Sequence, residues 1–147
     1  MLTISRDEII KMVPMPDAIA AMHRAFSDFN NGAFVLPDRI SMDINNKDAT
    51  VLVMPAYRKM GKYFTTKVVT VFQNIIAGRS STISSSVSVF NSSNGDLVAT
   101  MDGRAITSLR TGAATGLATK LLAKENVEVA AIFGTGVQAY TQVEAII

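Results

Sequence analysis

The first thirty residues place apolar side chains at the spacing of an α-helix. Ser5 and Glu8 have the spacing of a capping box, and a short apolar face follows them up to Pro14. Beyond Pro16 the apolar residues recur every three or four positions until Gly32. These residues are Ile19, Met22, Phe26 and Phe29. The pattern predicts a short helix that ends at Pro14 and a longer amphipathic helix packed against a core.

From Arg39 onward the apolar period shortens to about two, which is typical of β-strands. Runs of β-branched and aromatic residues at 39–44, 50–57 and 62–72 are separated by polar or glycine-containing joints. Two further alternating runs flank Asn94-Gly95, a strong hairpin signal. In the first of these runs one face carries Ser84, Ser86 and Ser88. Such small hydroxyl side chains suit either a subunit interface or a solvated sheet face.

A helical pattern returns after Asp102, which can cap a long helix that runs to about Lys124. Gly112 and Gly116 lie inside this helix, where each costs about 1 kcal/mol relative to alanine. The cost implies a close approach on that side, by a neighbouring backbone or by a ligand, and we favour the backbone. The apolar run 127–133 then predicts a buried strand, and a second helix is expected to start after the glycine turn at 134–139.

Composition narrows the classes of function. The 147 residues are 48% hydrophobic and 18% charged, with a net charge of +2, so a folded chain is expected and nucleic-acid binding is not. The absence of cysteine excludes disulfides, thiol nucleophiles and cysteine-bound zinc, and no metal site is predicted. His23 has no ligand partners in its segment and is expected to be a packed or half-exposed side chain. Without an apolar membrane span or signal peptide, we expect a soluble, cytoplasmic protein.

The motif Gly134-x-Gly136-x-x-Ala139 carries the strongest chemical signal. It follows an apolar run and opens a helix, which is the context of a dinucleotide-binding turn. Glycine permits the tight turn and the close approach of the backbone to a pyrophosphate, and the helix start offers free amide groups. Three cations, Arg39, Lys67 and Arg110, lie in or beside apolar runs and are candidate binders of a small carboxylate, although each alone could be a surface cation.

The segment MDGRAITSLRTGAATGLATKLLA followed by VAAIFGTGVQA resembles the ornithine cyclodeaminase and mu-crystallin family. The order of VLVMPAY, KVVTVFQN, Thr82 and the serine-rich hairpin upstream is also similar, so the resemblance covers essentially the whole chain. Departures from the family pattern include Gly112, where alanine is usual, and residues 72–74 and 79–81 on the substrate side. These departures affect the expected substrate more than the expected cofactor.

The resemblance implies a role for each matching residue. Arg39, Lys67 and Arg110 correspond to the substrate-carboxylate cations, with Lys67 and Arg110 at the catalytic site. The positions implied to contact a nicotinamide cofactor are Thr82, Arg110, Gly134, Gly136, Val137 and Gln138. The implied chemistry is hydride transfer between NAD or NADP and the α-carbon of an amino acid through an imine. Ornithine cyclodeamination is the first expectation, and amino-acid dehydrogenation, cyclic-imine or ketimine reduction, or mu-crystallin-like NADP binding without required catalysis are the alternatives.

The expected fold class is α/β, with two parts. Residues 1–124, including a connecting helix at 103–124, are expected to form an α+β domain for substrate binding and dimerisation. Residues 125–147 are expected to supply the first strand, turn and helix of an incomplete Rossmann domain, because a βαβ unit needs about 30 residues. The ribose-binding acid and the proton donor are expected beyond residue 147, so the chain alone is predicted to be inactive. We expect a homodimer that binds a small amino or imino acid; a scaffold acting through the serine-bearing sheet is the remaining alternative.

Overall fold

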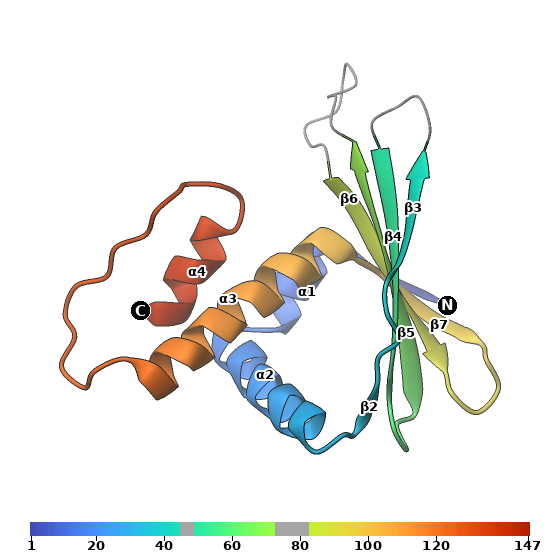
Figure 1. Ribbon diagram of the computed structural model, residues 1–147, viewed down its shortest axis with the longest axis horizontal. Coiled ribbons are helices and arrows are strands. Elements are labelled where there is room, and N and C mark those ends of the chain that lie inside the picture. The colour runs from blue at the N-terminus through green and yellow to red at the C-terminus, as the bar shows by residue number, and fades with distance from the viewer. Residues whose placement is uncertain (45–48, 73–82) are drawn as a thin grey trace. The chain divides into compact units, whose positions relative to one another are not determined.

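The computed structural model describes residues 1–44, 49–72 and 83–147, and in them seven strands form one sheet (Figure 1). The sheet order is β1-β7-β6-β5-β4-β2, with β3 also paired to β4. All neighbours are antiparallel except β1 and β7, which run parallel. The strands are β1 (Leu2–Ile4), β2 (Phe34–Val35), β3 (Ile40–Ile44), β4 (Ala49–Arg58), β5 (Tyr63–Phe72), β6 (Ile83–Asn91) and β7 (Leu97–Asp102).

The strands predicted from alternating residues are confirmed, and their register follows from consecutive antiparallel pairing. β4 and β5 pair over nine positions, from Ala49 opposite Phe72 to Tyr57 opposite Phe64. The hairpin signalled by Asn94-Gly95 joins β6 to β7, and the Asn91 side chain accepts hydrogen bonds from Ser93 in its turn. The sequence did not predict β1 or β2, which are only three and two residues long. Segments this short carry too few residues for an alternating pattern.

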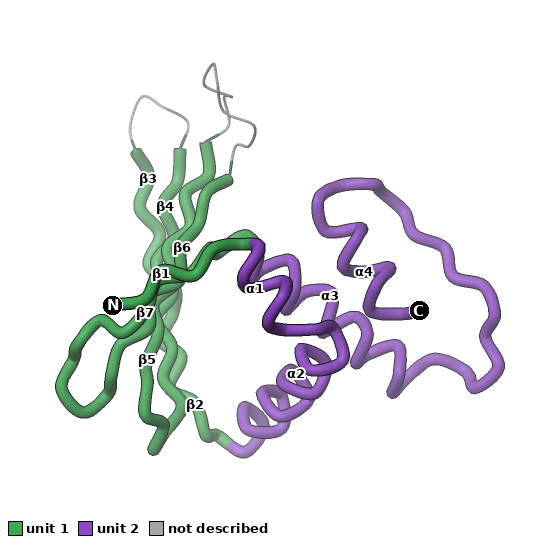
Figure 2. The backbone as a smooth tube through the Cα atoms, turned by 180° about the vertical axis from the view of Figure 1, so that it is seen from behind, with its two compact units in different colours: residues 1–6, 32–104 green, residues 7–31, 105–147 purple. Residues whose placement is uncertain are grey.

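Four helices accompany the sheet, and the described chain divides into two compact units (Figure 2). The helices are α1 (Arg6–Met12), α2 (Met15–Asn30), α3 (Gly103–Leu122) and α4 (Ala139–Ile146). The first unit contains residues 1–6 and 32–104, and the second contains residues 7–31 and 105–147. The sheet therefore belongs to the first unit and the helices belong almost entirely to the second. The domain boundary expected near residue 124 stays a prediction.

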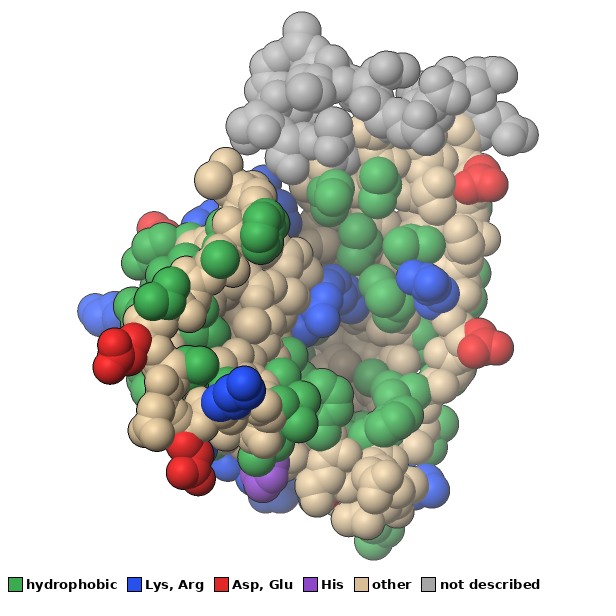
Figure 3. All heavy atoms as spheres, turned by 60° about the vertical axis from the view of Figure 1, so that its left-hand side comes forward, with side chains coloured by type: hydrophobic (Ala, Val, Ile, Leu, Met, Phe, Trp, Pro, Cys, Tyr) green, Lys and Arg blue, Asp and Glu red, His purple; other side chains and the backbone are tan. Residues whose placement is uncertain are grey.

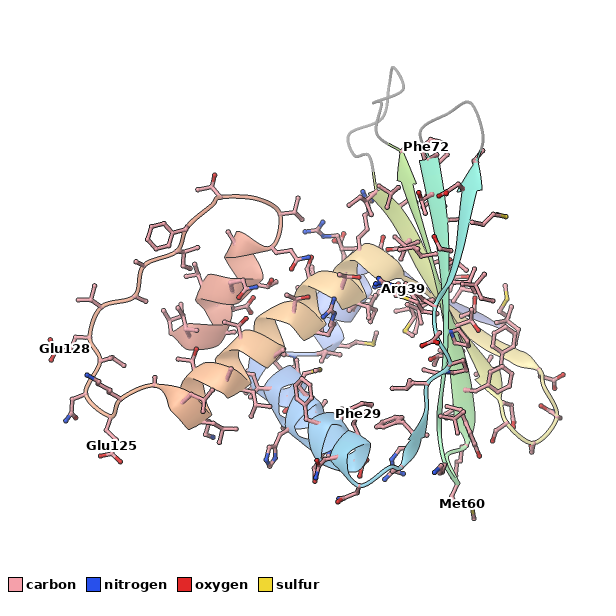
Figure 4. The ribbon with its side chains drawn as sticks, in the orientation of Figure 1. Phe29, Arg39, Met60, Phe72, Glu125 and Glu128 are labelled. Atoms are coloured by element: carbon pink, nitrogen blue, oxygen red, sulfur yellow. The ribbon has the colours of Figure 1, made fainter. Side chains whose placement is uncertain are left out.

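The core of the second unit lies where α2 packs on α3. Met15, Ala18 and Ala113 are buried there, with Ile19 and Met22 packed against them. The apolar stripe predicted on α2 is thus confirmed in its first half only. Phe26 and Phe29, near the end of the helix, are 51% and 59% exposed, and Figure 4 labels Phe29 there. Their period is helical, but the described part of this unit has no side chains that cover them.

The two glycines inside α3 are explained by a close helix crossing. A Cβ atom placed on Gly112 would overlap the backbone carbonyl of Thr141 in α4, and one placed on Gly116 would lie 2.6 Å from the carbonyl oxygen of Ala145. The two pairs share a four-residue spacing, so they lie on one side of each helix. The close approach expected from the sequence is therefore made by a neighbouring backbone.

Replacing Gly112 with alanine is expected to lower the free energy of unfolding by about 1–3 kcal/mol, because the methyl group forces α3 and α4 apart. The higher helix propensity of alanine acts in the opposite direction by about 1 kcal/mol. The exposed Ala118 of the same helix gives a matched control, since Ala118→Gly measures the propensity term alone. Denaturant unfolding of both variants checks this, and a stabilised Gly112→Ala variant would contradict the close packing.

The strand predicted at residues 127–133 is wrong for this chain. These residues have no regular secondary structure, and Val129 and Phe133 are 88% and 97% exposed. A β-strand needs a hydrogen-bonded neighbour, and the described residues of the second unit include no other strand. The helix expected after the glycine turn does form, as α4.

Candidate functional site

Two of the three predicted carboxylate-binding cations belong to the first compact unit. Lys67 lies at the middle of β5, directly opposite Met54 of β4 and Val87 of β6. Arg39 immediately precedes β3, one position beyond the pair formed by Ile40 and Val53, and Figure 4 shows it on the stretch that leads into this strand. Continuing this register places Arg39 next to Met54, so the two cations stand on either side of one methionine.

Side-chain alternation puts these residues on one face of the sheet, which we call the Lys67 face. Its residues in the three central strands include Met54, Lys67 and Val87. The diagonal neighbours of Lys67 on this face are Leu52, Ala56, Ser85 and Val89. Lys67 is partly buried and Arg39 is exposed. A lysine among apolar neighbours presents one positive charge at a defined place, which suits the binding of a small anion.

Arg110, the third cation, belongs to the second compact unit. It lies exposed on α3, one residue before Thr111, whose hydroxyl donates a hydrogen bond to the carbonyl of Thr107 at 2.6 Å. Arg39 and Lys67 belong to the first unit, and the proximity of Arg110 to them stays a prediction. Thr82, the cofactor contact implied by the resemblance, lies outside the described residues.

The glycine turn has part of the backbone geometry of a dinucleotide-binding turn, although the strand that precedes such a turn is absent at residues 127–133. Gly134 has a φ of +98°, a conformation that side-chain-bearing residues rarely adopt. A Cβ atom added at Gly134 or Gly136 would meet nothing within 4 Å, so open space borders the turn. Gln138 precedes α4 without capping it through its side chain, and the Ala139 amide donates a hydrogen bond to the carbonyl oxygen of Gly136 at 2.9 Å. The first amide groups of a helix have no partner inside the helix and can bind an anion. The residues present therefore fit the pyrophosphate of a dinucleotide.

The turn also borders a hollow of about 710 Å³ in the second unit. Thr115 and Thr119 of α3 line one side of it, and Gly134, Gly136 and Gln138 line the other. Val137 is 79% exposed beside them. All four residues predicted for the cofactor at this turn therefore border the same open space. A volume of several hundred Å³ is in the range of small-molecule sites.

Further observations on the described ranges concern metal sites, membrane spans and charged side chains. No group of three or more His, Asp or Glu side chains suited to a metal ion occurs there. None of the described helices combines the length and apolar character needed to cross a membrane. On the face drawn in Figure 3, the described Lys and Arg side chains are scattered among hydrophobic, neutral and acidic ones. His23 is an exposed residue of α2.

Comparison with known proteins assigns the family. The model of the ornithine cyclodeaminase/mu-crystallin family matches residues 2–147. The chain belongs to this family. The resemblance drawn from the arginine-containing helix and the GTGVQA turn is therefore confirmed, as is the mixed α/β fold class.

Several similar proteins act on imines or amino acids, as their names state. The chain is 36% identical over 147 residues to a Δ1-pyrroline-2-carboxylate reductase of Bacillus cereus, covering 99% of this chain and 45% of the relative. The solved Δ1-pyrroline-2-carboxylate reductase of Thermococcus litoralis, in complex with NADH and L-proline, is 34% identical with a TM-score of 0.89, covering 99% of this chain and 45% of that one. An archaeal alanine dehydrogenase dimer with bound NAD is 29% identical with a TM-score of 0.88, covering 99% and 44%. This chain thus spans less than half the length of each.

Proposed function

We propose that the full-length gene product reduces a cyclic imino acid, or a related ketimine, with a nicotinamide cofactor. The observation that carries the proposal is the combination of a dinucleotide-type turn at 134–139 with Lys67 presented by the sheet of a family member. The names of the Bacillus and Thermococcus relatives supply the reaction class. NADH and NAD in the solved relatives support NAD or NADP as the cofactor.

In the proposed reaction, Arg39 and Lys67 bind the substrate carboxylate by charge-assisted hydrogen bonds. This fixes the orientation of the α-carbon, and catalysis through positioning follows. When bound, a reduced nicotinamide supplies the hydride that the imine carbon accepts. The imine nitrogen gains a proton, so that an amino acid and the oxidised cofactor are the products. We assign Arg110 to both substrate and cofactor, as the resemblance implies.

Gly134, Gly136, Val137 and Gln138 are proposed to hold the cofactor through backbone groups. The positive φ of Gly134 and the uncapped start of α4 support this assignment. Residues 125–147 contain one glycine turn and one helix, and this chain covers less than half of the length of the relatives named above. We therefore expect the 147-residue chain alone to show no turnover.

The test is an assay of the full-length gene product with Δ1-pyrroline-2-carboxylate and either NADH or NADPH. Oxidation of the cofactor, with proline as the product, is the expected result, and product analysis distinguishes it from background hydrolysis of the imine. A folded protein that oxidises neither cofactor with a five- or six-membered cyclic imine would overturn the proposal.

Ornithine cyclodeamination is the second candidate, because the family that matches residues 2–147 includes this activity in its description. It differs in its products, since ornithine would release ammonia with no net change of the cofactor. Measuring ammonia from ornithine in the same preparation separates the two. Reductase activity without ammonia release supports the first candidate, and the reverse supports the second.

We also propose that the full-length protein is a homodimer that associates through the sheet face opposite Lys67. This face carries Ser84 and Ser86, which are exposed, together with Ile40 and Met42, which are 61% and 56% exposed. Small hydroxyl and exposed apolar side chains on one face suit close packing against a second sheet. The dimer named for the archaeal alanine dehydrogenase supports the proposal. A cytoplasmic location stays a prediction.

A further inference from the structure

Met54 lies in the middle of the predicted substrate-binding face, although its sequence context marks it only as a strand residue. It pairs with Lys67 across β4 and β5, and continuing the β3–β4 register by one residue places it beside Arg39, which precedes β3. Adjacent strands lie about 4.8 Å apart, so the backbones of Arg39 and Lys67 are separated by about 10 Å with Met54 between them. Both cations have side chains long enough to converge above the thioether.

The neighbours of this row on the sheet are mostly apolar, with Ser85 as a small polar neighbour of Lys67. Val87, on the other side of Lys67, is buried, and the diagonal positions on β4 are Leu52 and Ala56. Among the described strands, the acidic residue that shares this face is Asp43, whose carboxylate accepts a hydrogen bond from Thr50 at 3.0 Å. Thr50 is four residues from Met54 on β4, a distance of about 13 Å along a strand.

We propose that Met54 is a specificity-determining residue, whose side chain contacts the carbon skeleton of a substrate carboxylate held by Arg39 and Lys67. The inference rests on the proposed function and adds the residue that selects the substrate. A carboxylate bound between two converging cations places its attached carbon atoms against the thioether. An uncharged ring or alkyl chain is stabilised by this contact.

The experiment measures substrate preference in the full-length gene product carrying Met54→Ala. Its readout is the ratio of kcat/KM for Δ1-piperideine-2-carboxylate to that for Δ1-pyrroline-2-carboxylate, two cyclic imines that differ by one methylene. Removing the side chain makes room for the larger ring, so we expect the ratio to rise about tenfold. Met54→Leu, which conserves volume, and Met12→Ala, which removes an exposed methionine at the end of α1, are expected to leave the ratio within about threefold of the starting value.

The outcomes separate this inference from the proposed function. An active Met54→Ala variant with an unchanged ratio overturns the role of Met54 and leaves the reductase proposal standing. A starting protein that turns over neither imine overturns both. If Met54→Ala does not fold, Met54→Gln replaces it as a polar side chain of similar length. We then expect kcat/KM for Δ1-pyrroline-2-carboxylate to fall about tenfold relative to Met54→Leu, and equal values overturn the inference.

Discussion

Replacing Lys67 with methionine is expected to lower kcat/KM of the full-length gene product for a cyclic imino acid by about 100- to 1,000-fold. The methionine conserves the length of the side chain but removes the charge that is proposed to bind the substrate carboxylate. Losing one partner of a desolvated charge pair costs about 2–5 kcal/mol, and each 1.4 kcal/mol corresponds to a factor of ten. Steady-state kinetics with varied imine concentration measures the loss.

Lys62→Met is the charge-matched control, because Lys62 is exposed just before β5 and its loss changes the net charge equally. We expect this variant to retain kcat/KM within about twofold, as is usual for an exposed charge. The Lys67→Met variant should still bind NADH or NADPH, as measured by the shift in Tm. Full activity in Lys67→Met would exclude Lys67 from the site, whereas loss of cofactor binding as well would indicate a structural defect.

The alternation of apolar and polar residues predicts some features of the sheet and misses others. Alternating residues predict the long strands and the β6–β7 hairpin, because the alternation is contained within each strand's own sequence. They do not predict that β1 pairs in parallel with β7, since Leu2 and Ala99 are almost a hundred residues apart. The position of Met54 beside Lys67 is likewise not predicted by the sequence. Its place beside Lys67 depends on the register of β4 and β5, and only the pairing reveals it.

In the second unit, one apolar pattern that is typical of a strand does not form a strand, because the described residues of that unit include no neighbouring strand. Residues 127–133 are apolar enough for a buried strand, yet they are exposed because the described unit offers them no strand to pair with. Gly112 and Gly116 gave a more reliable signal. Their cost in a helix predicted a close approach, which the carbonyl groups of Thr141 and Ala145 make. Of the candidate site, the glycine turn and the three cations are sequence predictions, and the proximity of Arg110 to Lys67 stays one as well.

Replacing Gly136 with valine is expected to weaken NADH or NADPH binding to the full-length gene product by about 100-fold or more. A dinucleotide turn brings this backbone position against the pyrophosphate, and a β-branched side chain occupies the space that the phosphate needs. In the structure, a Cβ atom at Gly136 meets no atom within 4 Å, and its φ is not in the left-handed region. The protein should therefore fold with valine at this position, so a loss of affinity reports on the ligand. Titration of the reduced cofactor, followed by its fluorescence, gives the dissociation constant.

Gly134→Ala provides the comparison that makes this result interpretable. Because Gly134 has a φ of +98°, alanine there strains the backbone by about 1–3 kcal/mol whether or not a cofactor is bound. We therefore expect Gly134→Ala to lower both Tm and cofactor affinity, and Gly136→Val to lower affinity with Tm of the free protein within about 2 °C of the starting value. Gly136→Ala, with a smaller side chain, should weaken binding less than valine. Undiminished affinity in Gly136→Val would place the cofactor away from this turn and would remove the main support for a nicotinamide-dependent reaction.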